Sequence, residues 1–209
     1  MGIPAYVQGM KAFGYKSVAF GTIIQQNVPP MTGCRTALLR AKYTAAGTAH
    51  TLSILYPATS NGGHAPAAAT LLGSKNTASA LAASGQAVIN VTNAPTDPAG
   101  NAAASGDIIA YQCTDGTWEF NVVDSIAVKA ITVTTNLAKS VAALAKVRII
   151  GILADGFNMQ EPCGASATTT IEGEPALITP DFDEPCVIQS NNATATGFFL
   201  SALFAYINK

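Results

Sequence analysis

The sequence predicts a mainly β protein with little helix. N- and C-terminal segments are expected to form an antiparallel β-sandwich or barrel, with a small barrel-like β unit inserted between them. Short runs of alternating apolar and polar residues recur along the chain, as expected where one face of each strand is buried. Turn sequences rich in Gly, Pro, Asn and Asp separate these runs. Short strands with close turns between residues 86 and 153 are typical of a compact barrel. Two sequential β units are the alternative arrangement.

The expected domain organisation follows the changes in these patterns. Residues 1–16 interleave Gly and Pro with aromatic residues and predict an irregular N-terminal contact arm. Residues 17–63 together with 156–209 are expected to form the sandwich, and residues 64–155 the inserted β unit.

The clearest expected element is a β-hairpin centred on Asp115 and Gly116. An Asp-Gly pair accepts the positive φ angles of a two-residue type I′ turn. If Thr114 pairs with Thr117, strand alternation places one set of side chains on a single buried face: Ile109, Tyr111, Cys113, Trp118, Phe120 and Val122. A slip of one residue would put the aromatic side chains in water, so the register is expected to be well defined.

Other strands and one helical region are expected on both sides of this hairpin. Before it come a strand at 17–26, a second hairpin joining 36–44 with 49–56, a helical region within 67–83, and a strand at 86–92. After it come strands at 131–135, 146–150, 168–171 and 176–179, and a last hairpin joining 186–190 with 196–207. Gly73 is expected to interrupt the helical region and Gly85 to end it.

The predicted C-terminal strand is apolar on both of its faces. One face can fill the core of the subunit, whereas the second face needs a partner, since large exposed apolar patches usually mark interfaces. We therefore expect Phe199 and Leu203 to contact a partner. The arm residues Tyr6, Phe13 and Tyr15 are expected to add to this contact and to become ordered on binding.

Charge is sparse in this chain and nearly balanced. Lys and Arg number 11 and Asp and Glu number 12, a net charge of −1 that lacks the basic excess of a nucleic-acid binder. Charged residues make up 11% of the chain, against about 25% in ordinary soluble domains. The best candidate for a membrane span, residues 197–207, is shorter than the roughly 20 residues that a helix needs. We expect no nucleic-acid or membrane partner, and an oligomer or assembly component whose apolar surface other subunits cover.

The first residues lack a basic stretch followed by an apolar one, so we expect no secretory leader. The four cysteines are then expected to be free, buried thiols from a reducing compartment: Cys34, Cys113, Cys163 and Cys186. Cys163 and Cys186 each follow Glu-Pro, and a nearby carboxylate does not activate a thiol. If any two cysteines pair, these two are the first candidates.

The sequence carries no catalytic signature, and we expect no enzyme activity, cofactor or metal. A nucleophile elbow, a phosphate loop, a dinucleotide fingerprint and a Cys-x-x-Cys pair are all missing. His50 and His64 are the only histidines and offer little material for a metal or acid–base site. Glu172 and Glu174 belong to the one acidic cluster, whose spacing matches no Ca²⁺-binding loop. We expect a solvated acidic face there, or an electrostatic contact with a basic partner.

Several of these runs resemble a small β module common in tailed-bacteriophage virion proteins: SGQAVINV at 84–91, GDII at 106–109, DGT at 115–117 and ITVTT at 131–135. The ending EPCVIQSNNATATG at 184–197 is similar to the C-terminal strand pair of some phage head-decoration (capsid cement) proteins. The resemblance implies a structural protein on the capsid surface, assembled in the host cytoplasm, often as a homotrimer. Its expected partner is the phage major capsid protein, whose neighbouring subunits it would clamp, and it implies no active-site residue.

A receptor- or glycan-binding phage fibre or spike domain is the alternative function. Glycan sites favour exposed aromatic side chains with Asn, Asp or Gln nearby. Trp118 is the only tryptophan, and the predicted hairpin register buries it, which weighs against this alternative. An enzyme is a distant third.

Overall fold

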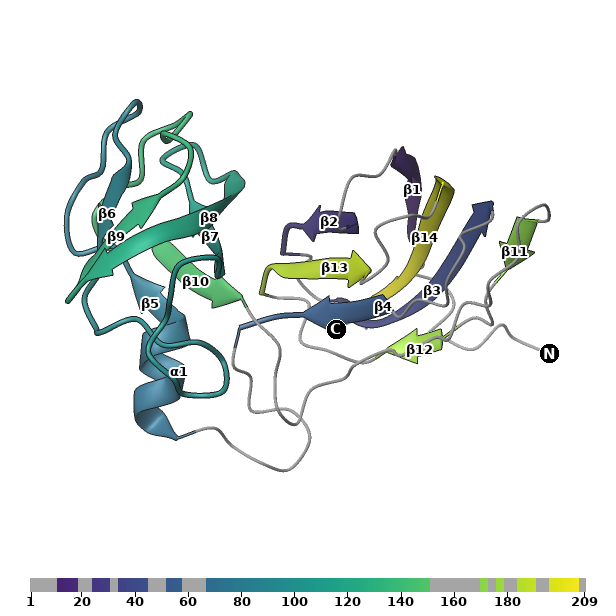
Figure 1. The fold of residues 1–209 in the computed structure, drawn as a ribbon, viewed down its shortest axis with the longest axis horizontal. Helices are drawn as coiled ribbons and strands as arrows, with labels where there is room; N and C mark the ends of the chain where they lie inside the picture. Colours follow the sequence, from purple (N-terminus) through teal and green to yellow (C-terminus); the bar gives the residue numbers. More distant parts are fainter. Residues whose placement is uncertain are drawn as a thin grey trace. The chain divides into compact units, whose positions relative to one another are not determined.

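A computed structural model confirms the predicted fold class. It describes residues 11–18, 24–30, 34–44, 52–57, 67–150, 170–172, 176–178, 184–190 and 196–206. This part of the chain is mainly antiparallel β structure and contains a single helix (Figure 1). The chain divides into two compact units, residues 1–54 with 157–209 and residues 55–156.

The first unit contains two sheets. One has the strand order β1 (Lys11–Val18), β14 (Thr196–Tyr206), β3 (Cys34–Thr44) and β11 (Thr170–Glu172), with β12 (Ala176–Ile178) also paired with β3. The other has the order β2 (Ile24–Val28), β13 (Cys186–Ser190) and β4 (Leu52–Leu55). Each sheet therefore combines strands from the two ends of the sequence.

The segment expected to be an irregular arm as far as residue 16 is partly a strand. β1 pairs with β14 from Lys11, which lies opposite Phe204, to Val18. The register shifts between Phe13 and Lys16, so the ladder absorbs the glycine that lies there as an irregularity instead of ending. The single strand expected at 17–26 is likewise divided between β1 and β2.

Two predicted hairpins are wrong, because strands that follow each other in the sequence belong to different sheets. β3 pairs with β14, β11 and β12 instead of β4, and β13 pairs with β2 and β4 instead of β14. Two of the observed pairs join strands of equal length. The two 11-residue strands β3 and β14 pair with each other, as do the 5-residue strands β2 and β13. Matched lengths leave fewer backbone N–H and C=O groups unpaired.

The second unit is a closed β-barrel. Its strand order is β5 (Lys75–Thr77), β10 (Lys146–Ile150), β7 (Ile108–Gln112), β8 (Trp118–Ala127), β9 (Ala130–Val133) and β6 (Val88–Asn90). The two ends of this order meet, since Ala78 pairs with Val91 and the Ser79 N–H donates to the Asn90 carbonyl (2.8 Å). Closure pairs the two strands at the ends of this order, which would otherwise be free edges.

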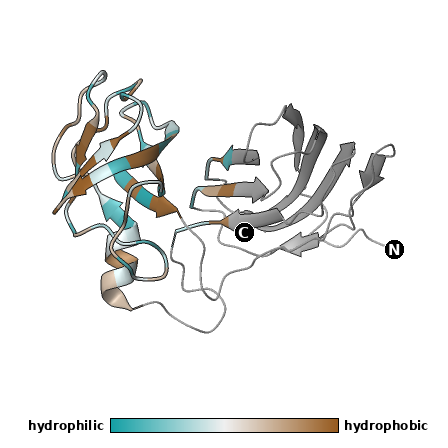
Figure 2. Cartoon of the chain, in the orientation of Figure 1, coloured by the Kyte–Doolittle hydropathy of each residue, from teal (hydrophilic) through white to brown (hydrophobic). Residues whose placement is uncertain are grey.

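The inside of the barrel is its hydrophobic core. Its members are Ala78, Ala82, Ile89, Val91, Ala103, Ile109, Tyr111, Cys113, Val123, Ile131, Val133, Leu137, Val141, Val147 and Ile149. Hydrophobic residues lie along the barrel strands, interrupted by polar ones (Figure 2). Tyr111 is an aromatic member, and burial raises its pKa to about 12.

Helix α1 (Ala68–Ser74) packs against β5 and β10. The predicted helical region thus contains one short helix, and Gly73 lies inside it instead of interrupting it. A side chain at Gly73 would collide with Thr96 and with the Ala94 carbonyl, so the close approach of the helix to this loop requires glycine. Asn76, buried in β5, fixes the same loop, since its Nδ2 donates to the Asn93 carbonyl (2.8 Å) and its Oδ1 accepts from the Asn93 N–H (3.1 Å).

The predicted register of the central hairpin is wrong by one residue. Tyr111 pairs with Glu119 in the β7–β8 ladder. The loop contains three residues instead of two, because Gly116 adopts a φ of 81° and the Cys113 N–H donates to the Thr117 carbonyl (2.8 Å). A left-handed residue after a type I turn is a common way to close a three-residue hairpin loop. The Asp-Gly pair therefore predicts the hairpin correctly but not the length of its loop.

The shift in register moves two aromatic residues to the outside of the barrel. Trp118 and Phe120 pair with Gln112 and Ala110, and alternation places them on the opposite face of the sheet from Tyr111. Both are half-buried. The expectation that Trp118 lies in the core beside Tyr111 is therefore wrong.

Candidate interaction surface

Large apolar side chains are exposed on the outside of the barrel. Leu81, Val88, Val128 and Leu144 are 64%, 38%, 83% and 78% exposed, and we call these four residues the apolar wall. Leu72, in α1, is also exposed (53%) but belongs to the helix. Single exposed hydrophobic residues are ordinary on protein surfaces, so the arrangement of the four decides whether they matter.

The four residues of the apolar wall occupy neighbouring segments around the barrel. Leu144 donates its N–H to the Ala78 carbonyl (2.8 Å), which joins its segment to the one that contains Leu81. In the segment of Leu81, Ala78 pairs with Val91, which directly follows β6, the strand that contains Val88. β6 in turn pairs with β9. Val128 lies in the turn that leads into β9. The wall therefore crosses consecutive segments of the barrel.

Val128 and Leu144 are both held in the left-handed region, with φ angles of 58° and 65°. This conformation costs an L-residue about 1–2 kcal/mol, and a β-branched residue such as Val rarely adopts it. Gly or Asn would accept the same backbone with less strain. Strained backbone positions concentrate at functional sites, so these two exposed apolar residues are candidates for contact with a partner.

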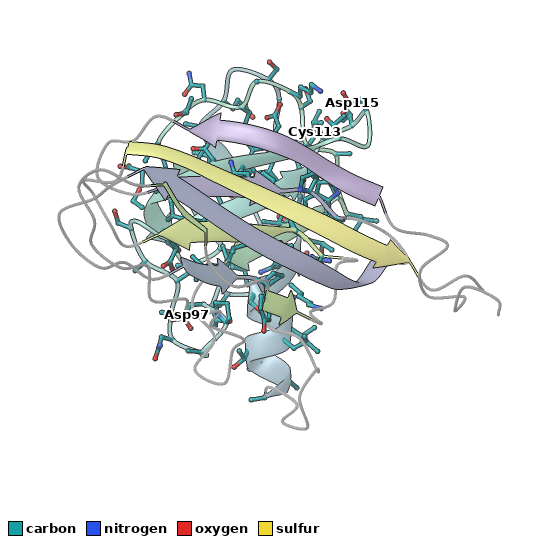
Figure 3. The ribbon with its side chains drawn as sticks, turned by 90° about the vertical axis from the view of Figure 1, so that its right-hand side faces the viewer. Asp97, Cys113 and Asp115 are labelled. Atoms are coloured by element: carbon teal, nitrogen blue, oxygen red, sulfur yellow. The ribbon has the colours of Figure 1, made fainter. Side chains whose placement is uncertain are left out.

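A polar cluster occupies the β7–β8 turn, where Asp115 lies near Cys113 and away from Asp97 (Figure 3). The Lys139 Nζ lies 2.8 Å from Asp115 Oδ2 and 2.9 Å from Thr117 Oγ1. Hydrogen bonds from Lys139 and from Thr117 hold the pKa of the Asp115 carboxyl well below its usual range. These exposed groups hold the turn together through an ion pair and hydrogen bonds.

Burial shifts the pKa of two titratable groups near the core. Burial raises the pKa of the Cys113 thiol, which keeps the reactive thiolate scarce. Burial also raises the pKa of Asp107, whose Oδ2 accepts a hydrogen bond from the Ala104 N–H (2.8 Å). Across the described residues, no group of three or more His, Cys, Asp and Glu side chains could hold a metal ion. In the same part of the chain, no helix is long and apolar enough to span a membrane.

The partner-contact residues predicted from the sequence fall mostly on one sheet of the first unit. Phe13 and Tyr15 lie in β1, Phe199 and Leu203 in β14, and Glu172 at the end of β11. Tyr6 and Glu174 lie outside the described residues. β14 is flanked by β1 and β3, with Leu203 opposite Ala12 and Leu38. The contact role of these seven residues remains a prediction.

The strand and turn patterns used above do not predict the apolar wall. Val128 and Lys129 form the two-residue turn between β8 and β9 without the Gly, Asn or Asp that normally marks such a turn. Leu81 lies in an Ala-rich stretch that was expected to be helical. An apolar residue where the strand pattern requires a turn is the one signal that could have identified Val128.

No protein-family model matches the chain, and a search of curated proteins finds no match. Among solved structures, VP17, a capsid protein of bacteriophage P23-77, aligns over 96% of this chain and 99% of its own, with 8% identity and a TM-score of 0.20. VP2 of infectious bursal disease virus aligns over 97% of this chain and 41% of its own, with 11% identity and a TM-score of 0.14. The chain thus spans less than half of VP2. At these TM-scores the alignments define no shared fold.

Proposed function

We propose that this chain is a structural virion protein that decorates and stabilises a bacteriophage capsid by binding between subunits of the major capsid protein. The observation that carries the proposal is the apolar wall. Two of its four residues, Val128 and Leu144, are 83% and 78% exposed and are held at strained φ angles. Contact with a partner would remove their apolar surface from water.

Composition and the sequence resemblance support the same role. Charged residues make up only 11% of the chain, which leaves little charge to cover an isolated subunit. The sequence resemblance to capsid cement proteins supplies the partner, the major capsid protein, and favours a homotrimer on the capsid surface. Burying Val128 and Leu144 against that partner would contribute about 1.5–3 kcal/mol each.

The proposal can be tested by adding the purified chain to phage heads that lack their decoration protein. Attachment is measured by co-sedimentation with the heads, and stabilisation by the temperature at which the heads open. A double variant, Val128→Ser with Leu144→Ser, should attach about a hundredfold more weakly, since it removes two contacts of about 1.5 kcal/mol each.

Leu72→Ser is the matched control, since Leu72 is exposed but lies in α1 outside the apolar wall. It should attach as the unmodified chain does. Equal losses in the control and the double variant would remove the wall from the contact. A chain that neither binds the heads nor raises their opening temperature would contradict the decoration role itself.

The acidic residues expected to meet a basic partner have their own test. Glu172→Lys combined with Glu174→Lys should weaken attachment more at low salt than at high salt, because salt screens attraction between exposed charges. Equal weakening at every salt concentration would assign this segment to folding instead of contact.

A receptor- or glycan-binding fibre or spike domain remains the second candidate, and one observation favours it. Trp118 was expected in the core, but it lies half-buried on the outside of the barrel with Gln112 opposite it. Stacking of a sugar on its ring would change the fluorescence of this single tryptophan. Titration with a panel of bacterial surface glycans should change that fluorescence if this candidate is correct, and should leave it unchanged if the protein only decorates capsids.

A further inference from the structure

β8 lacks a neighbouring strand on one side along parts of its length. β8 pairs with β7 from Trp118 to Val122 and with β9 from Val123 onward. Along residues 118–120, the edge of β8 that faces away from β7 has no paired strand among the described residues. Unpaired edges of this kind are sites where another chain can add a strand.

Alternation in the antiparallel ladder shows which backbone groups are unpaired. The Val123 N–H donates to the carbonyl of Asp107, the residue before β7 (2.8 Å). Val122 faces the other way, where its carbonyl accepts from the Thr134 N–H (2.9 Å). Phe120 and Trp118 lie two and four residues before Val122, so their N–H and C=O groups also face away from β7. These groups have no hydrogen-bond partner in the part of the chain that the structure describes.

The side chain of Asn121 ends the pairing that β9 would otherwise continue. Its Nδ2 donates to the Thr135 carbonyl (2.6 Å), and its Oδ1 accepts from the Thr135 N–H (3.2 Å) and from the Val122 N–H (2.9 Å). The Asn121 side chain therefore takes the place of a backbone partner at Thr135, where the segment that follows β9 diverges from β8. The edge beyond it is unpaired because a specific side chain stops the ladder there.

We propose that Trp118 to Phe120 is a strand-addition site that binds an extended segment of a partner chain. An extended backbone is the ligand whose N–H and C=O groups match the spacing of this edge. Trp118 and Phe120 offer half-buried aromatic side chains on the outer face, and Glu119 has a partly buried carboxylate on the face of Tyr111, with which it interacts. Cross-strand pairing then selects a segment with Lys or Arg between two apolar residues. This inference does not depend on the proposed capsid role.

Amide hydrogen exchange of the full chain tests the edge directly. In the free protein the Trp118 and Phe120 amides should exchange quickly, whereas the Glu119 amide, which faces β7, should exchange slowly. Adding the capped peptide Thr-Val-Lys-Val-Thr at millimolar concentration should slow exchange at Trp118 and Phe120 only. Slow exchange at both residues before any peptide is added, or no change when it is added, would overturn the proposal.

Substitutions at Phe120 separate backbone pairing from side-chain contact. Phe120→Pro removes an N–H that the β7 ladder does not use, and an edge strand tolerates proline at such a position. This variant should bind the peptide about threefold to tenfold more weakly, as expected for the loss of one hydrogen bond. Phe120→Val keeps the N–H and should bind more tightly than Phe120→Pro. Equal affinities for the two variants would rule out backbone pairing.

Variation of the peptide covers the case in which Phe120→Pro does not fold. A peptide with Glu in place of Lys should bind the unmodified chain more weakly, and Glu119→Gln should remove most of that difference. No difference between the two peptides would contradict the proposed charge pairing. Self-association of the chain that Phe120→Val preserves and Phe120→Pro abolishes, without peptide binding, would show that the edge binds a second copy and would overturn the partner segment.

Discussion

Replacing Val128 with Gly should stabilise the barrel, although it removes an apolar side chain. Val128 is 83% exposed, so little buried surface is lost. Its φ of 58° costs an L-residue about 1–2 kcal/mol, and glycine adopts this φ without that cost. The greater freedom of glycine in the unfolded chain offsets about 0.5–1 kcal/mol of the gain. We expect a net increase of about 0.5–1 kcal/mol in the free energy of unfolding.

The same substitution at Val88 is the matched control and should have the opposite sign. Val88 lies in β6, is 38% exposed, and does not have a positive φ. Glycine there relieves no strain, loses cross-strand contacts and increases the entropy of the unfolded chain. We expect the free energy of unfolding to fall by about 1–2 kcal/mol.

Urea unfolding of the full chain, followed by tryptophan fluorescence, measures both effects. The chain contains a single tryptophan, Trp118, and it lies in the barrel, so the signal reports on this unit. The midpoint should rise for Val128→Gly and fall for Val88→Gly, with similar slopes. If Val128→Gly lowers the midpoint as Val88→Gly does, the strain assigned to the β8–β9 turn is wrong.

Three further predictions concern the barrel. Tyr111→Ala should lower the free energy of unfolding by about 3–5 kcal/mol and Trp118→Ala by clearly less, measured by circular dichroism, because only the first side chain is in the core; equal losses would contradict the observed register. Asn76→Ala should cost about 2–3 kcal/mol, since partly buried backbone groups of Thr77 and Asn93 lose their partner, and a loss below 1 kcal/mol, measured by urea unfolding, would show that water replaces the amide. Hydrogen bonds lower the pKa of Asp115 in the folded state, so its stabilising contribution is present above its ordinary pKa of 3.8 and is lost as the pH falls below it. Asp115→Asn should therefore reduce the decline in stability on acidification, and a pH profile identical to that of the unmodified chain would contradict this assignment.

The sequence predicts the strands of this fold better than it predicts their partners. Alternation and turn residues are local signals, and they identify β10 at its observed bounds, Lys146–Ile150, and most other strands to within a few residues. The partner of a strand depends on residues far away in the sequence. β3 pairs with β14, although short connections in the sequence suggested hairpins with β4 and β13.

The candidate surface shows why local patterns are insufficient. The register of the central hairpin depends on whether Asp115 and Gly116 form a two- or three-residue loop, and both loops accept the same dipeptide. That single residue decides whether Trp118 lies in the core or outside the barrel. The exposure of Val128 follows from its place in a turn without turn-forming residues, and no periodic pattern predicts it.

The pairing of β1 with β14 has a consequence for how the protein forms during synthesis. Lys11 pairs with Phe204, so the first sheet cannot be completed until almost the whole chain has left the ribosome. At about 5–20 residues per second, β1 waits roughly 10–40 s for its partner. The barrel is continuous in sequence, from residue 55 to 156, and all of its strands emerge before β14 does. The nascent chain therefore carries a completed barrel while β1 and β3 still have unpaired edges, and these edges are most exposed to aggregation in that interval.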